Sequence, residues 1–536
     1  MTATAMKILH PPTVDVRAPS GGRIILRPVI SESWIPRTSR GGLALALVLL
    51  AAWFATGANR LNHTDLWGHL SFGRWMVEHR ALPQSDPFRS FADSELFLNV
   101  PWLSQILGYL WYRALGAEGM VLAHALLMTL TAGGLALAVM GRGVSAAWAA
   151  AAAAAAYLLC LPIVGTMRPQ VLGMAAFVGT LWAIAQLPRR RHPLFWLPIL
   201  FALWANLHGS FLMGLTALAG FAAGSTWDTW RERRNLRATW KQPVVAHAWL
   251  ALLLCVLGTC LNPLGVRLFP AVASFARTAN LAGISEWRPT EASSLTGVLL
   301  MVSLVATVAL VCCSPRRLTA WEALLLLGFG YLATTSIRML VWWGLFWPWY
   351  AAPHAAAICR SLWPARAADS PHPPEAVTAA RRRTLLVAVL VVLTATWSPS
   401  SSAVLGGRHR PNPSVFSPDT PYLVAEELAS RGITGRIVAP MDWADYLIWR
   451  TGGAVEPLVY THVHLSGPNL WEDFLHVQSA EAGWLELVDR YGLRYLVVSR
   501  ARQPGQQLAI AREPRCRIRY EDPQALLVEI LPRGTR

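Results

Sequence analysis

The segment "GLALALVLLAAWFATGANRLNHTDLWGHLSFGRW" (residues 42–75) joins an apolar run directly to a polar one. Residues 42–58 have the length and composition of a helix that crosses the hydrocarbon layer of a bilayer. The sixteen residues that follow Asn59 contain one acid, two histidines and two tryptophans. The segment therefore predicts a membrane-embedded fold in which polar groups gather just beyond the first span.

Composition places the whole chain in the same class. Of its 536 residues, 54% are hydrophobic and 14% are charged, whereas about a quarter of the residues in an average soluble domain are charged. In a soluble chain the net charge of +17 would suggest nucleic-acid binding. Here the arginines lie beside apolar runs, so we interpret them as signals of membrane topology, and we expect no nucleic-acid partner.

Eleven apolar windows have lengths close to the number of residues that a membrane span needs. They lie near residues 42–58, 119–140, 145–163, 170–187, 194–207, 210–225, 245–263, 296–313, 320–336, 339–357 and 384–398. Windows 194–207 and 210–225 are short and are joined by "NLHGS", so either of them is a candidate for a tilted or re-entrant helix. The sequence predicts about eleven transmembrane helices, with a margin of one pair.

Basic residues occupy every second gap between these windows. They are Arg17, Arg23, Arg27, Arg37 and Arg40, then Arg142, Arg189 to Arg191, "RERRNLRATWK" (231–241), Arg316, Arg317, Arg360, Arg366 and Arg381 to Arg383. Because positive residues favour the cytoplasmic side, residues 1–41 are predicted to be a cytoplasmic tail and the C-terminus to lie outside. No cleavable signal peptide is expected, since this tail is polar and basic and no A-x-A site follows the first span.

Polar side chains gather in the gaps on the predicted outer side. The candidates are Asp65, His69, Arg168, Gln170, Asn206, His208, Asn262, Glu286 and Arg338. A single polar residue at a helix end is usually a cap or an interface anchor. Polar groups in alternate gaps throughout the span region indicate instead a shared outward cavity.

The first outer loop, residues 59–118, is predicted to contain two helices. Residues 65–80 form a helix with Asp65 and His69 on one face. Residues 99–115 form an aromatic amphipathic helix at the lipid interface, with Pro101 in its first turn. Both helices are expected to cover the outward cavity. Two interpretations of Asp65 stay open. It has a chemical role in the cavity, or Thr64 or Asp65 simply caps the helix that follows.

The pattern changes after the last span. Residues 399–418 are rich in proline and serine and are predicted to be a linker. Residues 419–536 alternate short strands and helices and are predicted to form a small α/β domain. Asp442 and Asp445 have the spacing of a capping box. His462 and His464 alternate on a predicted strand, but two histidines do not make a metal site.

Several motifs along the whole chain carry a family resemblance. They are "DLWGHLSFGRWMVEHRALPQSDPF", "PWLSQ", "RPQ", "LWANLHGSF", "NPLG" and "EW". With an acid after the first span and a C-terminal outer domain, they resemble the GT-C class of polyprenyl-phosphate-sugar-dependent glycosyltransferases, and within it a bacterial group of GT-C-like membrane proteins. The resemblance implies a polytopic α-helical protein of the bacterial inner membrane, with a small extracytoplasmic α/β domain.

The resemblance also implies a reaction: transfer of a sugar from a polyprenyl-phosphate donor to a glycan, lipid or protein acceptor on the outer face of the membrane. Asp65 lies where the class has its catalytic acid and would act as general base. Arg168, Arg338 and His208 are the candidates that hold the donor phosphate, although each also suits a structural ion pair or a headgroup contact.

The remaining candidates have weaker assignments. Asn206 and Asn262 suit hydrogen bonds that pack spans together. Glu286 either pairs with Arg288 or is a second acid on the acceptor side. Leu66 and Trp67 follow Asp65, so no neighbouring acid completes a metal-binding pair. A divalent cation held by Asp65, His69 and a distant acid is the one cofactor considered.

Two other functions compete with sugar transfer. A transporter or flippase for lipid-linked glycans would also need a polar cavity, but the internal repeats and mid-span charges typical of alternating access are not evident in the sequence. A non-catalytic scaffold in envelope glycan assembly would share the fold without the activity.

Overall fold

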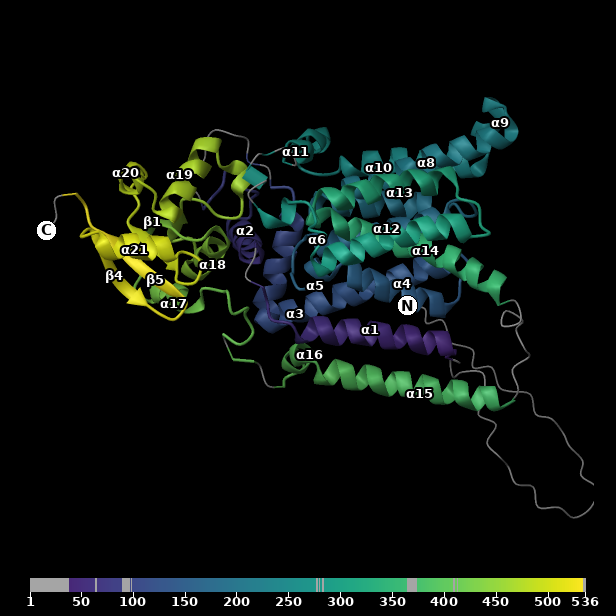
Figure 1. Ribbon diagram of the computed structural model, residues 1–536, viewed down its shortest axis with the longest axis horizontal. Coiled ribbons are helices and arrows are strands. Elements are labelled where there is room, and N and C mark those ends of the chain that lie inside the picture. The colour runs from purple at the N-terminus through teal and green to yellow at the C-terminus, as the bar shows by residue number, and fades with distance from the viewer. Residues whose placement is uncertain are drawn as a thin grey trace, which may run out of the picture.

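The computed structural model describes residues 38–62, 65–88, 97, 99–275, 278, 280, 281, 284–363, 374–407, 410, 411 and 413–533. Within these ranges the chain forms a bundle of helices with a small α/β domain at one end (Figure 1). Most of the predicted N-terminal tail, residues 1–37, lies outside the described residues.

Each of the eleven apolar windows lies on a helix. These helices are α1 (Arg40–Ala58), α3 (Trp102–Met140), α4 (Ala146–Leu159), α6 (Gln170–Gln186), α7 (Pro193–Leu207), α8 (Phe211–Arg233), α10 (Pro243–Thr259), α12 (Leu295–Cys313), α13 (Ala320–Thr335), α14 (Leu340–Leu362) and α15 (Pro374–Trp397). By length and composition, α1, α3 and α12 are long and apolar enough to cross a membrane, while α4, α6, α7, α10 and α13 are apolar but shorter. The number of spans stays a prediction.

Short elements fill the connections between these helices. They are α5 (Leu161–Val164), α9 (Leu236–Trp240), α11 (Leu268–Phe275) and the 3₁₀ turns η1 (Gly265–Arg267), η3 (Ser285–Trp287) and η4 (Ile337–Met339). Three of them, α5, η3 and η4, supply residues to the cavity described below.

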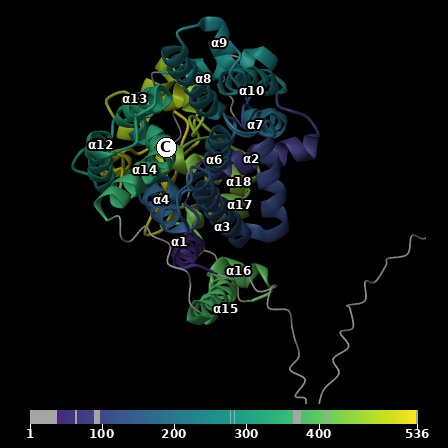
Figure 2. The ribbon, with the colours of Figure 1, turned by 90° about the vertical axis from the view of Figure 1, so that its right-hand side faces the viewer.

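Burial separates the inner helices from the outer ones. Helix α14 is buried along most of its length, and its Trp342 packs edge-on against Phe177 of α6 with ring centroids 5.4 Å apart. Helix α12 instead exposes apolar side chains such as Val305 and Val308. An end-on view places α6 near the middle of the bundle and α1 and α15 toward one edge (Figure 2). This distribution suits a bundle whose outer helices face lipid.

The second predicted helix of the outer loop is present. It shares the label α3 with the span after it, but the backbone of Gly116 is non-helical (φ 63°, ψ −160°) and kinks the chain between the two. Glycine adopts this positive φ without a steric penalty, so the chain changes direction there. The first predicted helix is α2 (Leu66–His79), which packs closely on α3. A Cβ at Gly73 of α2 would lie 2.1 Å from the Gln105 carbonyl oxygen.

Residues after α15 form α16 (Pro399–Val404), within the segment predicted as a linker, and then the α/β domain. Its five strands are β1 (Gly435–Val438), β2 (Val455–Pro457), β3 (Tyr495–Ser499), β4 (Cys516–Glu521) and β5 (Ala525–Ile530), in the order β2-β1-β3-β5-β4. Strand β1 is parallel to β2 and β3, and the other pairs are antiparallel. The helices are α17 (Tyr422–Ser430), α18 (Met441–Thr451), α19 (Pro468–Ser479), α20 (Trp484–Arg490) and α21 (Pro504–Arg512).

Two predictions for this domain are wrong. Strand β2 ends at Pro457, a residue that has no N–H for the ladder, and His462 and His464 lie at a 3₁₀ turn, η6 (Val463–Leu465), rather than on a strand. Asp442 and Asp445 do not form a capping box, because helix α18 begins after Pro440 without a side-chain cap.

The α/β domain packs directly on the first outer loop. Trp67 of α2 is fully buried, and its ring contacts Phe416, Tyr446 and Trp449 at centroid distances of 5.4, 5.0 and 6.0 Å. One turn of this helix, at Gly68, lies against the buried carboxylate of Asp445 on α18. The domain thus forms one wall around the helix that follows Asp65.

Candidate functional site

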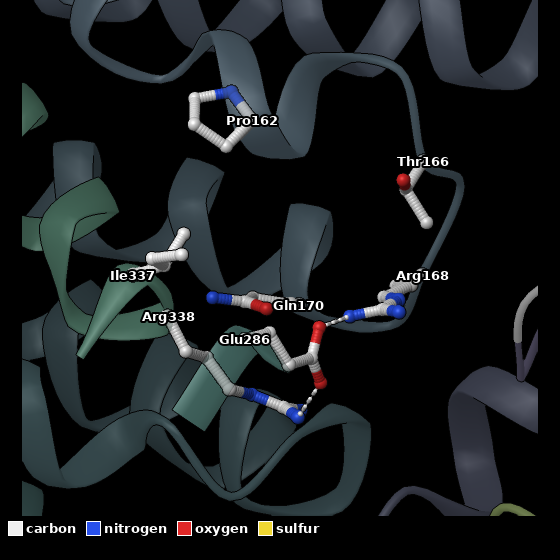
Figure 3. A pocket seen from close by; sticks show the side chains of 7 residues that line it. All are labelled: Pro162, Thr166, Arg168, Gln170, Glu286, Ile337 and Arg338. Carbon is white, nitrogen blue, oxygen red and sulfur yellow. Dashed lines mark hydrogen bonds and ion pairs between the residues drawn. The ribbon is translucent and has the colours of Figure 1, made fainter. Parts of the chain in front are cut away.

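A small polar cavity lies where α5, α6, η3 and η4 meet (Figure 3). Its volume is about 180 Å³, and it is lined by Pro162, Thr166, Arg168, Gln170, Glu286, Ile337 and Arg338. Four of these residues, Arg168, Gln170, Glu286 and Arg338, are predicted site residues. Segments far apart in the sequence therefore meet at one cavity.

Two arginines and two carboxylates form a chain of ion pairs at this cavity. Arg168 Nε lies 2.9 Å from Asp65 Oδ1, and its Nη1 donates to Glu286. The other oxygen of Glu286 accepts from Arg338 Nη1 at 2.8 Å. Figure 3 shows the Glu286 carboxylate between the two guanidinium groups. Although burial opposes its charge, the two carboxylates raise the pKa of Arg168, so its guanidinium is a cation here.

Asp65 occupies the position just before α2, but its side chain does not cap the helix. The carboxylate points instead to Arg168. Glu286 likewise pairs with Arg168 and Arg338. Among the described residues, the ion pairs of Glu286 are therefore with Arg168 and Arg338 rather than with Arg288, and its role as a second acid on the acceptor side stays a prediction.

His69 lies one turn after Asp65, with its Nε2 3.8 Å from Asp65 Oδ2. Burial lowers the pKa of His69, the two arginines lower it further, and Asp65 opposes them. Gln105 contacts the ring on its other side, with its amide nitrogen 3.1 Å from Nδ1 of His69. The amide oxygen of Gln105 accepts a hydrogen bond from Asn99 at 2.7 Å. Donation from Gln105 leaves the imidazole proton on Nε2, the nitrogen that faces Asp65.

Sequence reasoning missed Gln105 as a site residue. The motif "PWLSQ" contains it, but its partner His69 is 36 positions away in the chain. Only the packing of α2 on α3 brings the two side chains together.

The other predicted residues divide into neighbours of the cavity and packing groups. Burial, with help from Arg338 and His69, lowers the pKa of His208 to about 3, so this residue is neutral and offers a phosphate no positive charge. Its Nδ1 is within hydrogen-bond distance of Ser210 Oγ, at 2.8 Å. Asn206 accepts from Trp102 at 2.8 Å and donates to the Leu261 carbonyl, while Asn262 shapes its own turn through the Leu264 N–H.

Gln170 is the last of the predicted residues at the cavity. Its side-chain oxygen is buried and, among the described residues, has no hydrogen-bond partner. Figure 3 shows the amide beside Glu286. A polar ligand in the cavity would satisfy this oxygen with a hydroxyl or N–H group.

The described part of the chain contains no group of three or more histidine, cysteine, aspartate or glutamate side chains that could hold a metal ion. Asp65 and Glu286 instead share the guanidinium of Arg168.

The bundle, the outer loop and the α/β domain together define the class of fold. No protein-family model and no curated protein sequence matches the chain. Among solved structures, the chain is similar to the oligosaccharyltransferase of Archaeoglobus fulgidus in the apo form, with 12% identity and a TM-score of 0.52 over 85% of this chain and 69% of that one.

Two further solved structures are similar over most of this chain. ArnT from Cupriavidus metallidurans has 15% identity and a TM-score of 0.50 over 90% of this chain and 97% of that one. The mycobacterial arabinofuranosyltransferase AftD has 18% identity and a TM-score of 0.50 over 93% of this chain and 42% of that one. All three are GT-C glycosyltransferases, and this chain has a GT-C-like fold.

Proposed function

We propose that this protein is a glycosyltransferase that moves a sugar from a polyprenyl-phosphate donor to an acceptor hydroxyl at the outer face of the bacterial inner membrane. The observation that carries the proposal is the Arg168–Glu286–Arg338 bridge beside Asp65. This arrangement places two anion-binding guanidinium groups next to a carboxylate, and both are needed for transfer from a phosphate leaving group.

Arg168 and Arg338 are the groups that would hold the donor phosphate. They already bind one anion between them, the carboxylate of Glu286. A phosphate has the charge and the oxygen atoms to replace that carboxylate, and arginine binds such oxygens with paired N–H groups. A second structure of the Archaeoglobus oligosaccharyltransferase, which contains a dolichol-phosphate and has a TM-score of 0.50, supports a lipid phosphate as ligand.

Asp65 would act as general base. The acceptor hydroxyl gives its proton to the Asp65 carboxylate while its oxygen bonds to the anomeric carbon. The bond between that carbon and the phosphate oxygen breaks, and its electron pair leaves with the phosphate. Arg168 and Arg338 stabilise the resulting negative charge. Because Arg168 contacts Asp65 as well as the phosphate position, one side chain aligns the base and the leaving group.

His69 is a positioning residue in this scheme. Its Nε2–H faces Asp65, and the Gln105–Asn99 pair fixes the ring. Glu286 would move to one guanidinium or toward the acceptor when a donor phosphate enters. The acceptor itself is assigned only to a class, as a glycan, lipid or protein with a free hydroxyl group.

The test is sugar transfer by purified Asp65→Asn protein in nanodiscs. Asparagine keeps the size of the side chain and removes the base, so turnover should fall by roughly 10² to 10⁴ while the melting temperature stays near that of the wild type. Glu78→Gln is the matched control, because Glu78 is an exposed acid at the other end of the same helix. Near-normal transfer by Asp65→Asn would end the assignment.

A further inference from the structure

An apolar groove lies on the side of the bundle between α3, α6 and α7. Its volume is about 520 Å³, within the range of about 300–1,000 Å³ that is typical of ligand sites. Its lining includes Gly134, Leu137, Ala175, Gly179, Trp182 and Trp196. None of these residues lines the candidate active site, which lies at the other end of α6.

Small residues let the helices that line the groove approach one another closely. A Cβ at Gly134 would lie 3.1 Å from Val178, and a Cβ at Gly179 would lie 3.1 Å from Leu200. Neither glycine could therefore carry a larger side chain unless its neighbour moved. The rim carries Leu130 and Leu137, whose side chains are 58% and 59% exposed. A hollow with an apolar lining and exposed leucines on its rim suits a hydrocarbon chain rather than a sugar.

At the end near the α6–α7 turn, the groove is lined by aromatic and histidine side chains. There the ring of Trp182 lies 5.7 Å from His192 and 5.5 Å from Trp196 between centroids, and Trp196 donates to His192 at 3.4 Å. Tryptophan and histidine, with an apolar body and a polar edge, suit the level of lipid headgroups.

Three consecutive arginines adjoin this end of the groove. Arg189, Arg190 and Arg191 form the turn between α6 and α7 and are all exposed. No ion pair joins any of them to another described residue. They supply uncompensated positive charge directly beside His192, a lining residue.

We propose that this groove binds an anionic phospholipid, with one acyl chain between α3, α6 and α7 and the phosphate at Arg189 to Arg191. Basic pockets between membrane helices are known to bind anionic headgroups, and the pairing of such a pocket with a hydrocarbon groove fits both parts of one lipid. From Gln170 to Trp182 is twelve positions along α6, or about 18 Å at 1.5 Å per residue, so this site is separate from the proposed catalytic one.

A competing explanation is that the arginines only set topology. Topology requires positive charge on the correct side but no contact with a particular lipid. The two explanations differ in what they expect when equal charge is removed elsewhere on the same side of the membrane.

The experiment is native mass spectrometry of the purified full-length protein with phosphatidylglycerol or phosphatidylcholine of identical acyl chains. We expect retention of phosphatidylglycerol to exceed that of phosphatidylcholine by at least about fivefold, as about 1 kcal/mol from a single arginine contact would give. The combined variant Arg189→Gln, Arg190→Gln, Arg191→Gln should lower this ratio to about one.

A charge-matched control carries Arg231→Gln, Arg233→Gln and Arg237→Gln, three exposed arginines around the end of α8. It should keep the wild-type ratio, and an equal fall in this control would overturn the proposal. Ala175→Phe places a large ring in the groove and should reduce retention of both lipids. Unchanged retention in a folded Ala175→Phe protein would also overturn it, and if that variant unfolds, the comparison of the two arginine variants decides alone.

Discussion

Arg168 is the residue on which the candidate site depends, because it contacts acids from two distant segments, Asp65 and Glu286. A planar guanidinium makes both contacts at once, whereas an ammonium group is a point charge. Arg168→Lys and Arg338→Lys should therefore each weaken donor binding by about tenfold or more although the charge is kept. Titration of the purified variants with a polyprenyl phosphate measures this loss.

The control for these variants is Arg288→Lys, in the same segment as Glu286 but with an exposed side chain. It should bind the donor like the wild type. If both site variants also kept their affinity, Arg168 and Arg338 would be structural residues only.

Asp445 allows a prediction about pH. Its carboxyl is fully buried, and a Cβ at Gly68 would lie 2.3 Å from Oδ1. Burial raises the pKa of Asp445 well above its usual value, Thr461 opposes this, and Asp65 adds to it. The folded protein thus keeps a proton that the unfolded chain loses above about pH 4, so stability falls as pH rises toward the folded pKa.

Asp445→Asn removes this titration while keeping the shape of the side chain. As pH is raised from 4 to 9, the melting temperature of the variant should increase relative to that of the wild type. Parallel curves of melting temperature against pH for the two proteins would contradict a protonated Asp445.

Most residues of the candidate site can be predicted from the sequence, but the contacts between them cannot. Asp65, Arg168, Glu286 and Arg338 stand out because charged groups beside apolar runs are costly and rare. The contact between Asp445 and Gly68 links positions 377 apart (445 − 68). Local spacing instead suggested a cap for Asp445, because a capping box and a buried carboxyl have the same short pattern.

Among the elements, the contact between α2 and α3 leaves no room for a larger side chain. A Cβ at Gly73 would lie 2.1 Å from the Gln105 carbonyl oxygen, and backbone cannot rotate away as a side chain can. Gly73→Ala should therefore separate the helices and destabilise the protein by about 1–3 kcal/mol. It should also lower activity, since α2 carries His69 and α3 carries Gln105.

Gly108→Ala is the matched control on α3, because its Cβ would lie 3.6 Å from Leu70, an ordinary contact distance. Thermal unfolding of both variants distinguishes them. Equal melting temperatures would show that α2 does not depend on close approach at Gly73.

Elements are predicted well where hydrophobicity alone decides them. All eleven apolar windows are helices, because a long apolar run satisfies its backbone only within itself. The predicted interfacial helix and the next span also form, and the non-helical backbone at Gly116 separates them. The sequence places this break well, because glycine adopts a positive φ readily.

At the scale of the whole molecule, the alternating arginine gaps predict how the chain lies in the membrane. Single cysteines introduced at Ser293→Cys and Ser430→Cys should react with a membrane-impermeant reagent from outside. Those at Arg190→Cys, Arg233→Cys and Arg316→Cys should react only after the membrane is opened. Labelling of intact cells against permeabilised cells is the measurement.

The α/β domain is the decisive part of this test. Residue 430 lies on α17 within that domain (Figure 1), and the domain packs on α2 through Trp67. If Ser430→Cys reacted only from inside, the outward position of the cavity would be lost together with the orientation of the chain.

The Glu286 bridge has a consequence for the pace of a catalytic cycle. A lipid phosphate that reaches Arg168 and Arg338 meets cations whose charge is already balanced by Asp65 and Glu286. Its capture is an exchange of one anion for another, and the net gain is the difference between two similar attractions. In the proposed reaction, such a site would hold its carrier lipid loosely. After sugar transfer, the returning carboxylate would compete for the same arginines and help to release the spent carrier, so weak retention would favour repeated turnover.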